Sequence, residues 1–389
     1  MRPTSDPIVR SAAKAGAAAD AALGDLPEWN LADLYKGIDA PEVQRDLKTA
    51  LADAQAFETK YKGTLDGLAR KAGGPKQLGA AVAAFEQLEE LLGRLISFAG
   101  LVYAGDTSDP KRAKFYGDVQ ERITAASSHL LFFTLELNRI DDKVLEAAMA
   151  EPTLGHYRPW LEDIRKDKPY ELEDRIEQLF HEKSVTGRGA WNRLYDETLA
   201  ALRFTVDGET LTLEPALNLM QHSDENKRRA AAEEIGRVLG ENQRVFTLVT
   251  NTLAKDKEIS DRWRGFEDIA DSRHLANRVE REVVEAMVSA VRDAYPRLSH
   301  RYYALKAKWF GKEALDYWDR NAPLPKVPQR TIPWGEARDT VLSAYARFSP
   351  DMSDIARRFF DKDWIDAPRK SSLACANAEI RSLTIQQSF

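Results

Sequence analysis

The chain has 389 residues, of which 43% are hydrophobic and 30% charged, and its formal net charge is −6. These values are typical of a globular protein with room for two or three domains. An acidic balance argues against a nucleic-acid-binding surface, and no run approaches the ~20 apolar residues of a membrane span. We therefore expect neither nucleic acid nor a membrane as a partner.

The termini and the single cysteine, Cys375, indicate the compartment. One cysteine excludes an internal disulfide framework and favours reducing surroundings. The alanine-rich run 11–23 carries Lys14 and Asp20 and lacks the apolar centre of a signal peptide. We interpret residues 1–28 as a flexible tail and expect a cytoplasmic protein, with a targeting peptide as the alternative.

Helical periodicity predicts a mainly α protein, with layered helical hairpins in an N-terminal lobe over residues 29–202. Asp39 and Pro41 indicate a first helix start, in which Asp39 accepts from free backbone N–H groups. The apolar run 130–133 predicts deep burial within a long third helix. The further predicted helices of this lobe are 77–103, 108–139, 142–151, 171–182 and 190–202, the last with Trp191 and Leu194 facing inward.

A small β-hairpin is predicted over residues 204–213. Asp207-Gly208 suits a two-residue turn with positive φ, and Val206 and Leu211 flank it with period-two alternation. The hairpin opens a second region, residues 203–368.

Helices return after the hairpin. One starts at Ser223-Asp224 and is expected to turn Lys227-Arg228-Arg229 to solvent, and Ser349-Pro350 predicts another start. The proline-rich segment 319–333 predicts a surface connection or an extended segment. Residues 369–389 show weak amphipathicity and are interpreted as an atypical C-terminal tail. The predicted helices start near 214 and 223 and cover 243–259, 280–294, 297–310, 334–348 and 350–360.

The histidines lack the spacing of a catalytic zinc site. Such a site in a peptidase needs two His at i and i+4 of one helix, with a Glu beside the first to act on the metal-bound water. No two of the six histidines are four residues apart, and after His181-Glu182 the second position is Val185. We therefore predict no catalytic and no metal-binding residue in this chain. The histidines are His129, His156, His181, His222, His274 and His300.

Two weaker candidates remain. His274 and Asn277 lie one turn apart and could present polar groups to a channel, but helix capping or a satisfied interior hydrogen bond is the favoured interpretation. Tyr302 and Tyr303 could line a substrate groove, although aromatic residues at this spacing are more often core.

The adjacent acidic residues and the cysteine are weaker candidates for catalysis. The adjacent acids Glu89-Glu90 and Glu233-Glu234 point in different directions on helices, so neither forms a catalytic dyad. Cys375 has no His at a readable spacing and is not a candidate nucleophile.

Several motifs, taken in order over roughly 340 residues, resemble the oligoendopeptidase F branch of the thimet oligopeptidase family of zinc metallopeptidases. The resemblance covers the front portion only of such an enzyme, and no single motif is specific for it. The motifs are 27–35, 186–191 with the hairpin 204–213, 223–229, 251–257, 262–264 with His274 and Asn277, 301–306 and 319–323.

The resemblance implies a mostly helical fold with a deep channel between two helical lobes that admits short peptides. It also implies zinc, held by the two His of an H-E-x-x-H motif and a Glu on a following helix. All of these ligands would lie beyond the region that resembles the family, so none is carried over to this chain.

Three readings follow from this. The first is an oligopeptidase family member that ends before its zinc motif and is inactive alone, with an exposed apolar surface. The second is a non-catalytic peptide-binding or scaffold protein, or one half of a split enzyme whose C-terminal half is separately encoded. The third is a hydrolase that uses a different set of catalytic residues. The sequence offers neither a nucleophile–base pair nor a nucleophile elbow to support it.

Overall fold

The computed structural model describes residues 23–325 and 331–367. The described chain is mainly α, with one two-stranded sheet, as the sequence predicts. The predictions for residues 1–22, for the tail 369–389 and for Cys375 lie outside the described residues.

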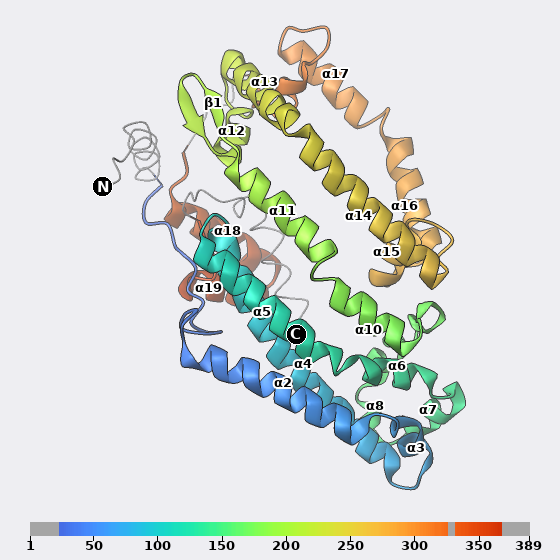
Figure 1. Ribbon diagram of the computed structural model, residues 1–389. Helices are drawn as coiled ribbons and strands as arrows, with labels where there is room; N and C mark the ends of the chain where they lie inside the picture. The colour runs from blue at the N-terminus through green and yellow to red at the C-terminus, as the bar shows by residue number, and fades with distance from the viewer. Residues whose placement is uncertain (1–22, 326–330, 368–389) are drawn as a thin grey trace.

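The N-terminal part packs its helices in hairpins (Figure 1). The long helix α4 (Gly74–Gly105) lies against both α2 (Pro41–Tyr61) and α5 (Pro110–Ser128). Aromatic rings pack between α2 and α4, where the ring centroids of Phe57 and Phe85 lie 6.2 Å apart. Phe133 meets Phe57 edge-on, with 5.0 Å between centroids. The shorter elements here are α3 (Leu65–Arg70), α6 (Leu131–Arg139), α7 (Asp142–Ala148), α8 (Pro152–Gly155), α9 (Arg158–Ile164), the 3₁₀ turn η1 (Lys168–Tyr170) and α10 (Asp174–Lys183).

Two predictions for this part are wrong in detail. The residue that precedes α2 is Ala40, and no side chain, including that of Asp39, caps the helix. The predicted helix 108–139 is two helices, because the chain turns at His129 and Leu130. The turn follows Ser127 and Ser128, whose hydroxyls donate to carbonyls of the preceding turn, a bond that bends helices.

The predicted burial of the apolar run is confirmed. Leu130, Phe132 and Phe133 are all buried in the main core.

The β-hairpin is confirmed. Strands β1 (Phe204–Val206) and β2 (Glu209–Leu211) pair antiparallel, with Val206 opposite Glu209. Asp207 and Gly208 both have positive φ, at 51° and 82°, as a two-residue turn of this type requires.

The hairpin packs on α12 and α13. Together with α11 and α14, these helices form an arm above the N-terminal part (Figure 1). In this arm α11 (Arg188–Ala201) lies beside α14 (Gln243–Arg264), and α12 (Leu213–Leu219) packs on α13 (Glu225–Glu241). Leu194 of α11, predicted to face inward, is 42% exposed.

The last described elements pack sparsely. Helices α18 (Trp334–Phe348) and α19 (Pro350–Asp361) form a hairpin, and the predicted cap of α19 by Ser349 is confirmed. The residues that follow α19 contact the segment before α2, where the Asn30 amide donates to the Asp363 carbonyl at 2.8 Å. Between α14 and α18 lie α15 (Asp271–Ala276), α16 (Arg281–Ala294), α17 (Ser299–Trp309) and the 3₁₀ turn η2 (Tyr317–Asp319).

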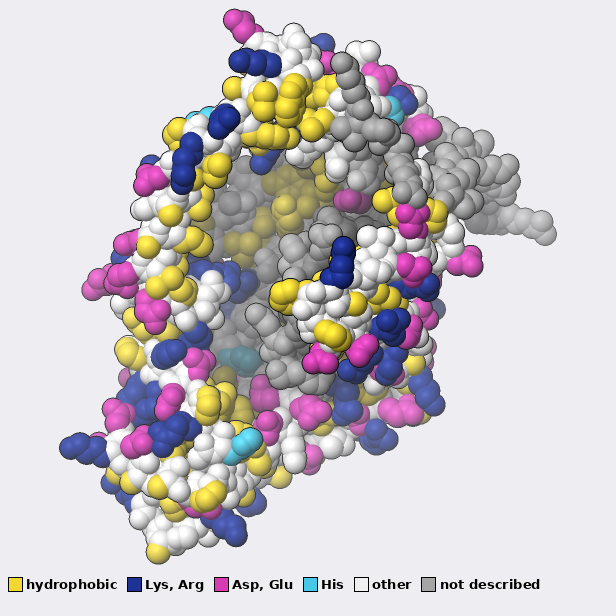
Figure 2. Space-filling model, turned by 180° about the vertical axis from the view of Figure 1, so that it is seen from behind, with side chains coloured by type: hydrophobic (Ala, Val, Ile, Leu, Met, Phe, Trp, Pro, Cys, Tyr) yellow, Lys and Arg dark blue, Asp and Glu magenta, His cyan; other side chains and the backbone are white. Residues whose placement is uncertain are grey.

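The apolar core is concentrated in one half of the chain. The main cluster of buried side chains runs from Tyr35 to Leu161, whereas the second contains Phe204, Ala216, Ile235 and Val238. All exposed large hydrophobic side chains of the described residues lie at Leu179 or later. Seen from behind, the molecule is hollowed, with hydrophobic side chains inside the hollow (Figure 2). None of the described helices is both long and apolar enough to cross a membrane.

Candidate functional site

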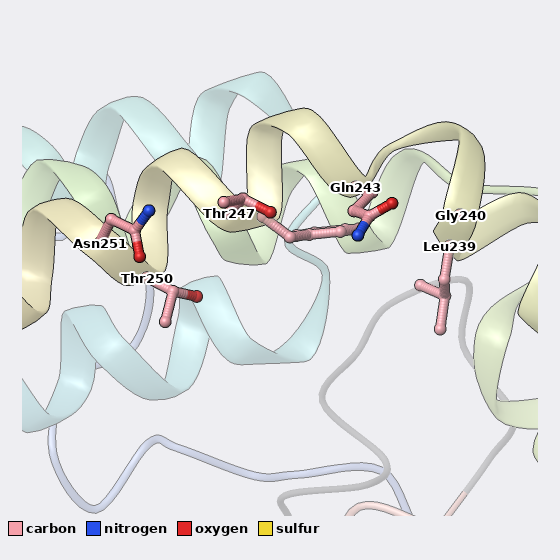
Figure 3. Close-up of a pocket in the computed structure, with 7 residues that line it drawn as sticks. Leu239, Gly240, Gln243, Thr247, Thr250 and Asn251 are labelled. Atoms are coloured by element: carbon pink, nitrogen blue, oxygen red, sulfur yellow. The ribbon is translucent and has the colours of Figure 1, made fainter.

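A cavity of about 450 Å³ lies where α13 ends and α14 begins. Its lining is free of charged side chains. Gln243, Thr247, Thr250 and Asn251 lie along one side of α14 (Figure 3). The remaining lining residues are Leu239, Gly240 and Phe246.

Packing between two helices fixes the cavity wall. Phe246 of α14 meets Tyr195 of α11 edge-on, with ring centroids 5.5 Å apart. Val249 of α14 is buried, whereas the next residue, Thr250, is exposed. The wall is thus a rigid helix face that carries amide and hydroxyl groups.

The histidines do not form a metal site. All six are described, and each belongs to a different segment of the chain. His129 Nδ1 lies 2.6 Å from a carboxylate oxygen of Glu58. His181 lies at the end of α10, and its Nε2 is 2.8 Å from the hydroxyl of Ser127 in α5. These are local structural contacts, and no group of potential metal ligands among the described residues includes a histidine.

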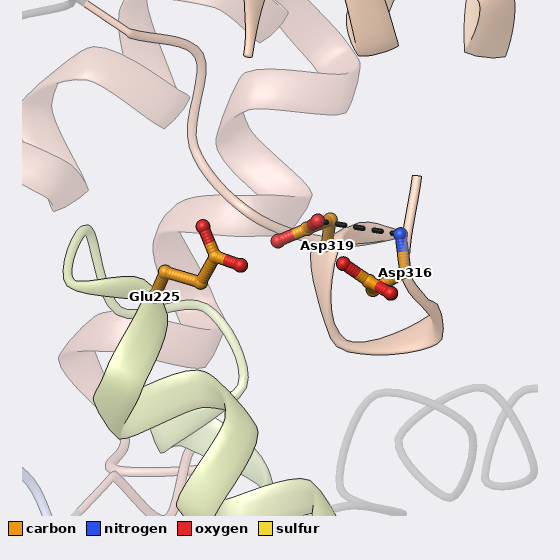
Figure 4. A group of neighbouring side chains, drawn as sticks. All are labelled: Glu225, Asp316 and Asp319. Atoms are coloured by element: carbon orange, nitrogen blue, oxygen red, sulfur yellow. Dashed lines mark hydrogen bonds between the residues drawn. The ribbon is translucent and has the colours of Figure 1, made fainter. Parts of the chain in front are cut away.

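In the described chain, the side chains close enough to share a metal ion are Glu225, Asp316 and Asp319 (Figure 4). The ammonium of Lys312 already lies among them, at 2.5 Å from Glu225, 2.8 Å from Asp316 and 2.6 Å from Asp319. A protein cation therefore already pairs with all three carboxylates. The donor set does not fit the zinc that the family implies.

Arg228 overturns a prediction from the sequence. It was expected to face solvent, but it is 1% exposed and donates to Asp319 at 2.6 Å. Burial by itself raises the pKa of Asp319, but hydrogen bonds from Arg228 and Lys312 outweigh burial and hold that pKa below its ordinary value. Asp319, predicted to open a surface connection, is fully buried. This network fastens η2 to α13.

The weaker candidates are also placed. His274 lies in the short helix α15, and Asn277 is its C-terminal cap, in line with the favoured interpretation. Tyr302 and Tyr303, for which a core position was favoured, are 45% and 38% exposed.

The adjacent acids Glu233 and Glu234 pair with different arginines, Arg229 and Arg237. The hydrogen bond from Arg237, and then that from the Thr205 amide, lower the pKa of Glu234 to about 2. Glu234 therefore holds the hairpin on α13 as a fixed anion.

Comparison with known proteins shows similarity to one class of peptidases. A family model described as Oligopeptidase F matches residues 136–204. Oligopeptidase PepF of Bacillus subtilis (strain 168) is 23% identical over 350 residues, which are 87% of this chain and 50% of that protein. The Oligoendopeptidase F homolog of Borreliella burgdorferi is 19% identical over 284 residues, or 72% of this chain and 48% of that protein.

The fold agrees with these matches. The crystal structure of oligoendopeptidase-F from Enterococcus faecium is similar with a TM-score of 0.64 and 21% identity, over 81% of this chain and 58% of that chain. Fold and matches together show a mainly α protein that is similar to the oligopeptidases. More narrowly, the chain is similar to the oligoendopeptidase F branch of the thimet oligopeptidase family, as its motifs predicted.

The chain spans about half the length of the curated relatives it matches. Neither the sequence nor the comparisons suggested the cavity on α14. The nearest signal in the sequence is Asn251-Thr252, which opens the motif 251–257.

Proposed function

We propose that this chain is the front portion of a zinc-dependent oligopeptidase that acts on short peptides, and that residues 1–389 alone hydrolyse no peptide. The observation that carries the proposal is a mismatch. Similarity to Oligopeptidase PepF runs over 87% of the chain, yet the chain contains no pair of His four residues apart. Without such a pair the protein cannot hold and activate a zinc-bound water in the way of this peptidase class.

The test is zinc content together with peptide turnover. The purified chain is dialysed against a chelator, supplied with zinc, and assayed with a quenched fluorescent peptide. We expect no turnover and no stoichiometric zinc after removal of the excess metal. Turnover by the chain alone, or tightly held zinc, would contradict the proposal, and circular dichroism on the same sample shows whether it is folded.

A second candidate function, one half of a two-polypeptide enzyme, is favoured by the apolar face of α16. No residue of this helix is buried. Val283, Met287 and Val291 recur every four residues and are 55%, 59% and 48% exposed. Such a stripe on a surface helix is typical of a face that packs against another element. The proposed occupant is the half of the family's chain that this protein does not cover.

Co-expression tests this candidate. The chain is produced with the part of Oligopeptidase PepF that it does not match, and the two are purified through a tag on one of them. We expect co-purification that Met287→Glu weakens and Ser289→Glu, an exposed polar position of the same helix, leaves unchanged. Equal recovery of both variants would count against this face, and self-association of the chain alone would indicate a second copy as its occupant.

A further inference from the structure

The cavity on α14 combines a suitable size with unused hydrogen-bonding groups. Its volume of about 450 Å³ lies in the range of small-ligand pockets. Gln243, Thr247, Thr250 and Asn251, here called the amide–hydroxyl stripe, are all exposed. None of these four side chains bonds to another side chain or to the backbone within the described residues, unlike the neighbouring Asn242, which donates to the Val238 carbonyl.

The spacing of the stripe matches an extended peptide. A helix rises 1.5 Å per residue, so Gln243 and Thr247 lie about 6 Å apart along the axis, and Thr247 and Asn251 lie about 6 Å further. Residues four apart share one helix face. Main-chain groups on one side of an extended peptide recur every two residues, or about 6.7 Å. The stripe can therefore meet successive main-chain groups of about four peptide residues.

The chemistry of the stripe suits main-chain recognition. Each Asn or Gln amide offers both a donor and an acceptor, and a Thr hydroxyl does the same, which is what alternating N–H and C=O groups require. The lining has no charge that would select for a charged peptide side chain. Leu239 and Phe246, both half-buried, provide an apolar floor at one end of the stripe.

We propose that the amide–hydroxyl stripe binds the main chain of a short extended peptide with little regard to its sequence, and that one apolar side chain of the peptide lies against Leu239 and Phe246. This proposal rests on the proposed function, since it assigns the peptide-holding role to named residues. It requires no zinc and no catalysis by this chain.

Fluorescence anisotropy with a fluorescein-labelled, uncharged hexapeptide containing one leucine tests the proposal. We expect Thr247→Val combined with Asn251→Ala to weaken binding roughly tenfold, the value of one to two hydrogen bonds. Gly240→Leu should weaken it as well by occupying the cavity, because a Cβ on Gly240 meets no atom within 4 Å. The matched controls Thr210→Val and Gln55→Ala, exposed on β2 and α2, should bind like the wild type.

Two further arms separate main-chain recognition from other modes. A scrambled peptide should bind equally well, whereas an N-methylated peptide of the same sequence should bind at least about tenfold more weakly because it lacks donors. Binding should change little between about 0.05 and 0.5 M salt, since no ion pair is involved.

Three results would overturn the proposal. They are wild-type affinity in both cavity variants, unchanged binding of the N-methylated peptide, and no peptide binding by the folded wild-type chain. None of them bears on the zinc and turnover assay, so failure of the stripe and failure of the proposed function are distinguishable.

Discussion

At the scale of single residues, Arg228 shows how context reverses the expectation for a charged side chain. It lies in a run of three cations, of which Lys227 and Arg229 are exposed. Its guanidinium is held by the carbonyls of His222 and Ser223, at 2.9 Å each, and by Asp319. Hydrogen bonds to fixed acceptors offset the cost of taking the charge out of water. The pair therefore joins two segments 91 residues apart.

We predict that Asp319→Asn lowers the free energy of unfolding by about 3 kcal/mol, because it leaves the buried Arg228 without its counter-charge. Urea denaturation at neutral pH measures this. The pKa of Asp319 is lower in the folded state than its ordinary 3.8, so its stabilising effect is present above that pH and lost as pH falls through the folded value. The difference between variant and wild type should thus shrink in acid.

The matched control is Glu233→Gln, which removes the partner of the exposed Arg229. An exposed pair of this kind contributes about 0.5 kcal/mol or less. Equal losses in the two variants would show that the Arg228–Asp319 pair is not the stabilising contact described here.

At the scale of elements, two helical glycines have opposite surroundings. Gly79 of α4 faces the backbone of α8, and a Cβ there would lie 2.8 Å from the Leu154 amide nitrogen. Gly236 of α13 faces open space, with nothing within 4 Å of a Cβ. The first glycine permits two helices to touch, whereas the second only weakens its own helix.

We predict that Gly236→Ala raises the stability of the protein by about 0.5–1 kcal/mol through helix propensity. Gly79→Ala should lower stability by about 1–3 kcal/mol, since backbone atoms must move apart to admit the methyl group. Thermal unfolding of the two variants beside the wild type measures both shifts. A stabilising Gly79→Ala would contradict the close approach of α4 and α8.

At the scale of the whole molecule, stability is unevenly distributed. The main core lies within residues 35–161. Two sets of ion pairs tie later helices to residues 163–177, which directly follow that core. Arg264 binds Glu177, and Arg278 binds Asp163 and Asp167. Because these links are polar and partly exposed, they position the arm without adding apolar burial to it.

We predict that amide hydrogens of α4 exchange far more slowly than those of α16 and α17, which have few buried contacts. Regions with little apolar burial open at low free energy, whereas a central core opens only with global unfolding. Hydrogen exchange followed by mass spectrometry measures this directly. Equal protection of α4 and α16 would show that the chain unfolds as one cooperative unit, and the domain division predicted between residues 202 and 203 would then fail.

The sequence by itself determined the local structure of this protein. The period of the apolar residues, the Asp207-Gly208 turn and the Ser349 cap depend on contacts within a few residues, so the helices and the hairpin could be predicted. The missing histidine pair was equally readable, because the ligands of such a site share one helix.

The tertiary structure alone decided the long-range pairings. The burial of Arg228 depends on Asp319, and the exposure of Tyr302 depends on how the described elements pack around α17. No local pattern encodes either of these. The stripe on α14 likewise became a cavity wall only because α13 ends beside it. Side chains far apart in the chain acquire their environment from packing, and packing is a property of the whole fold.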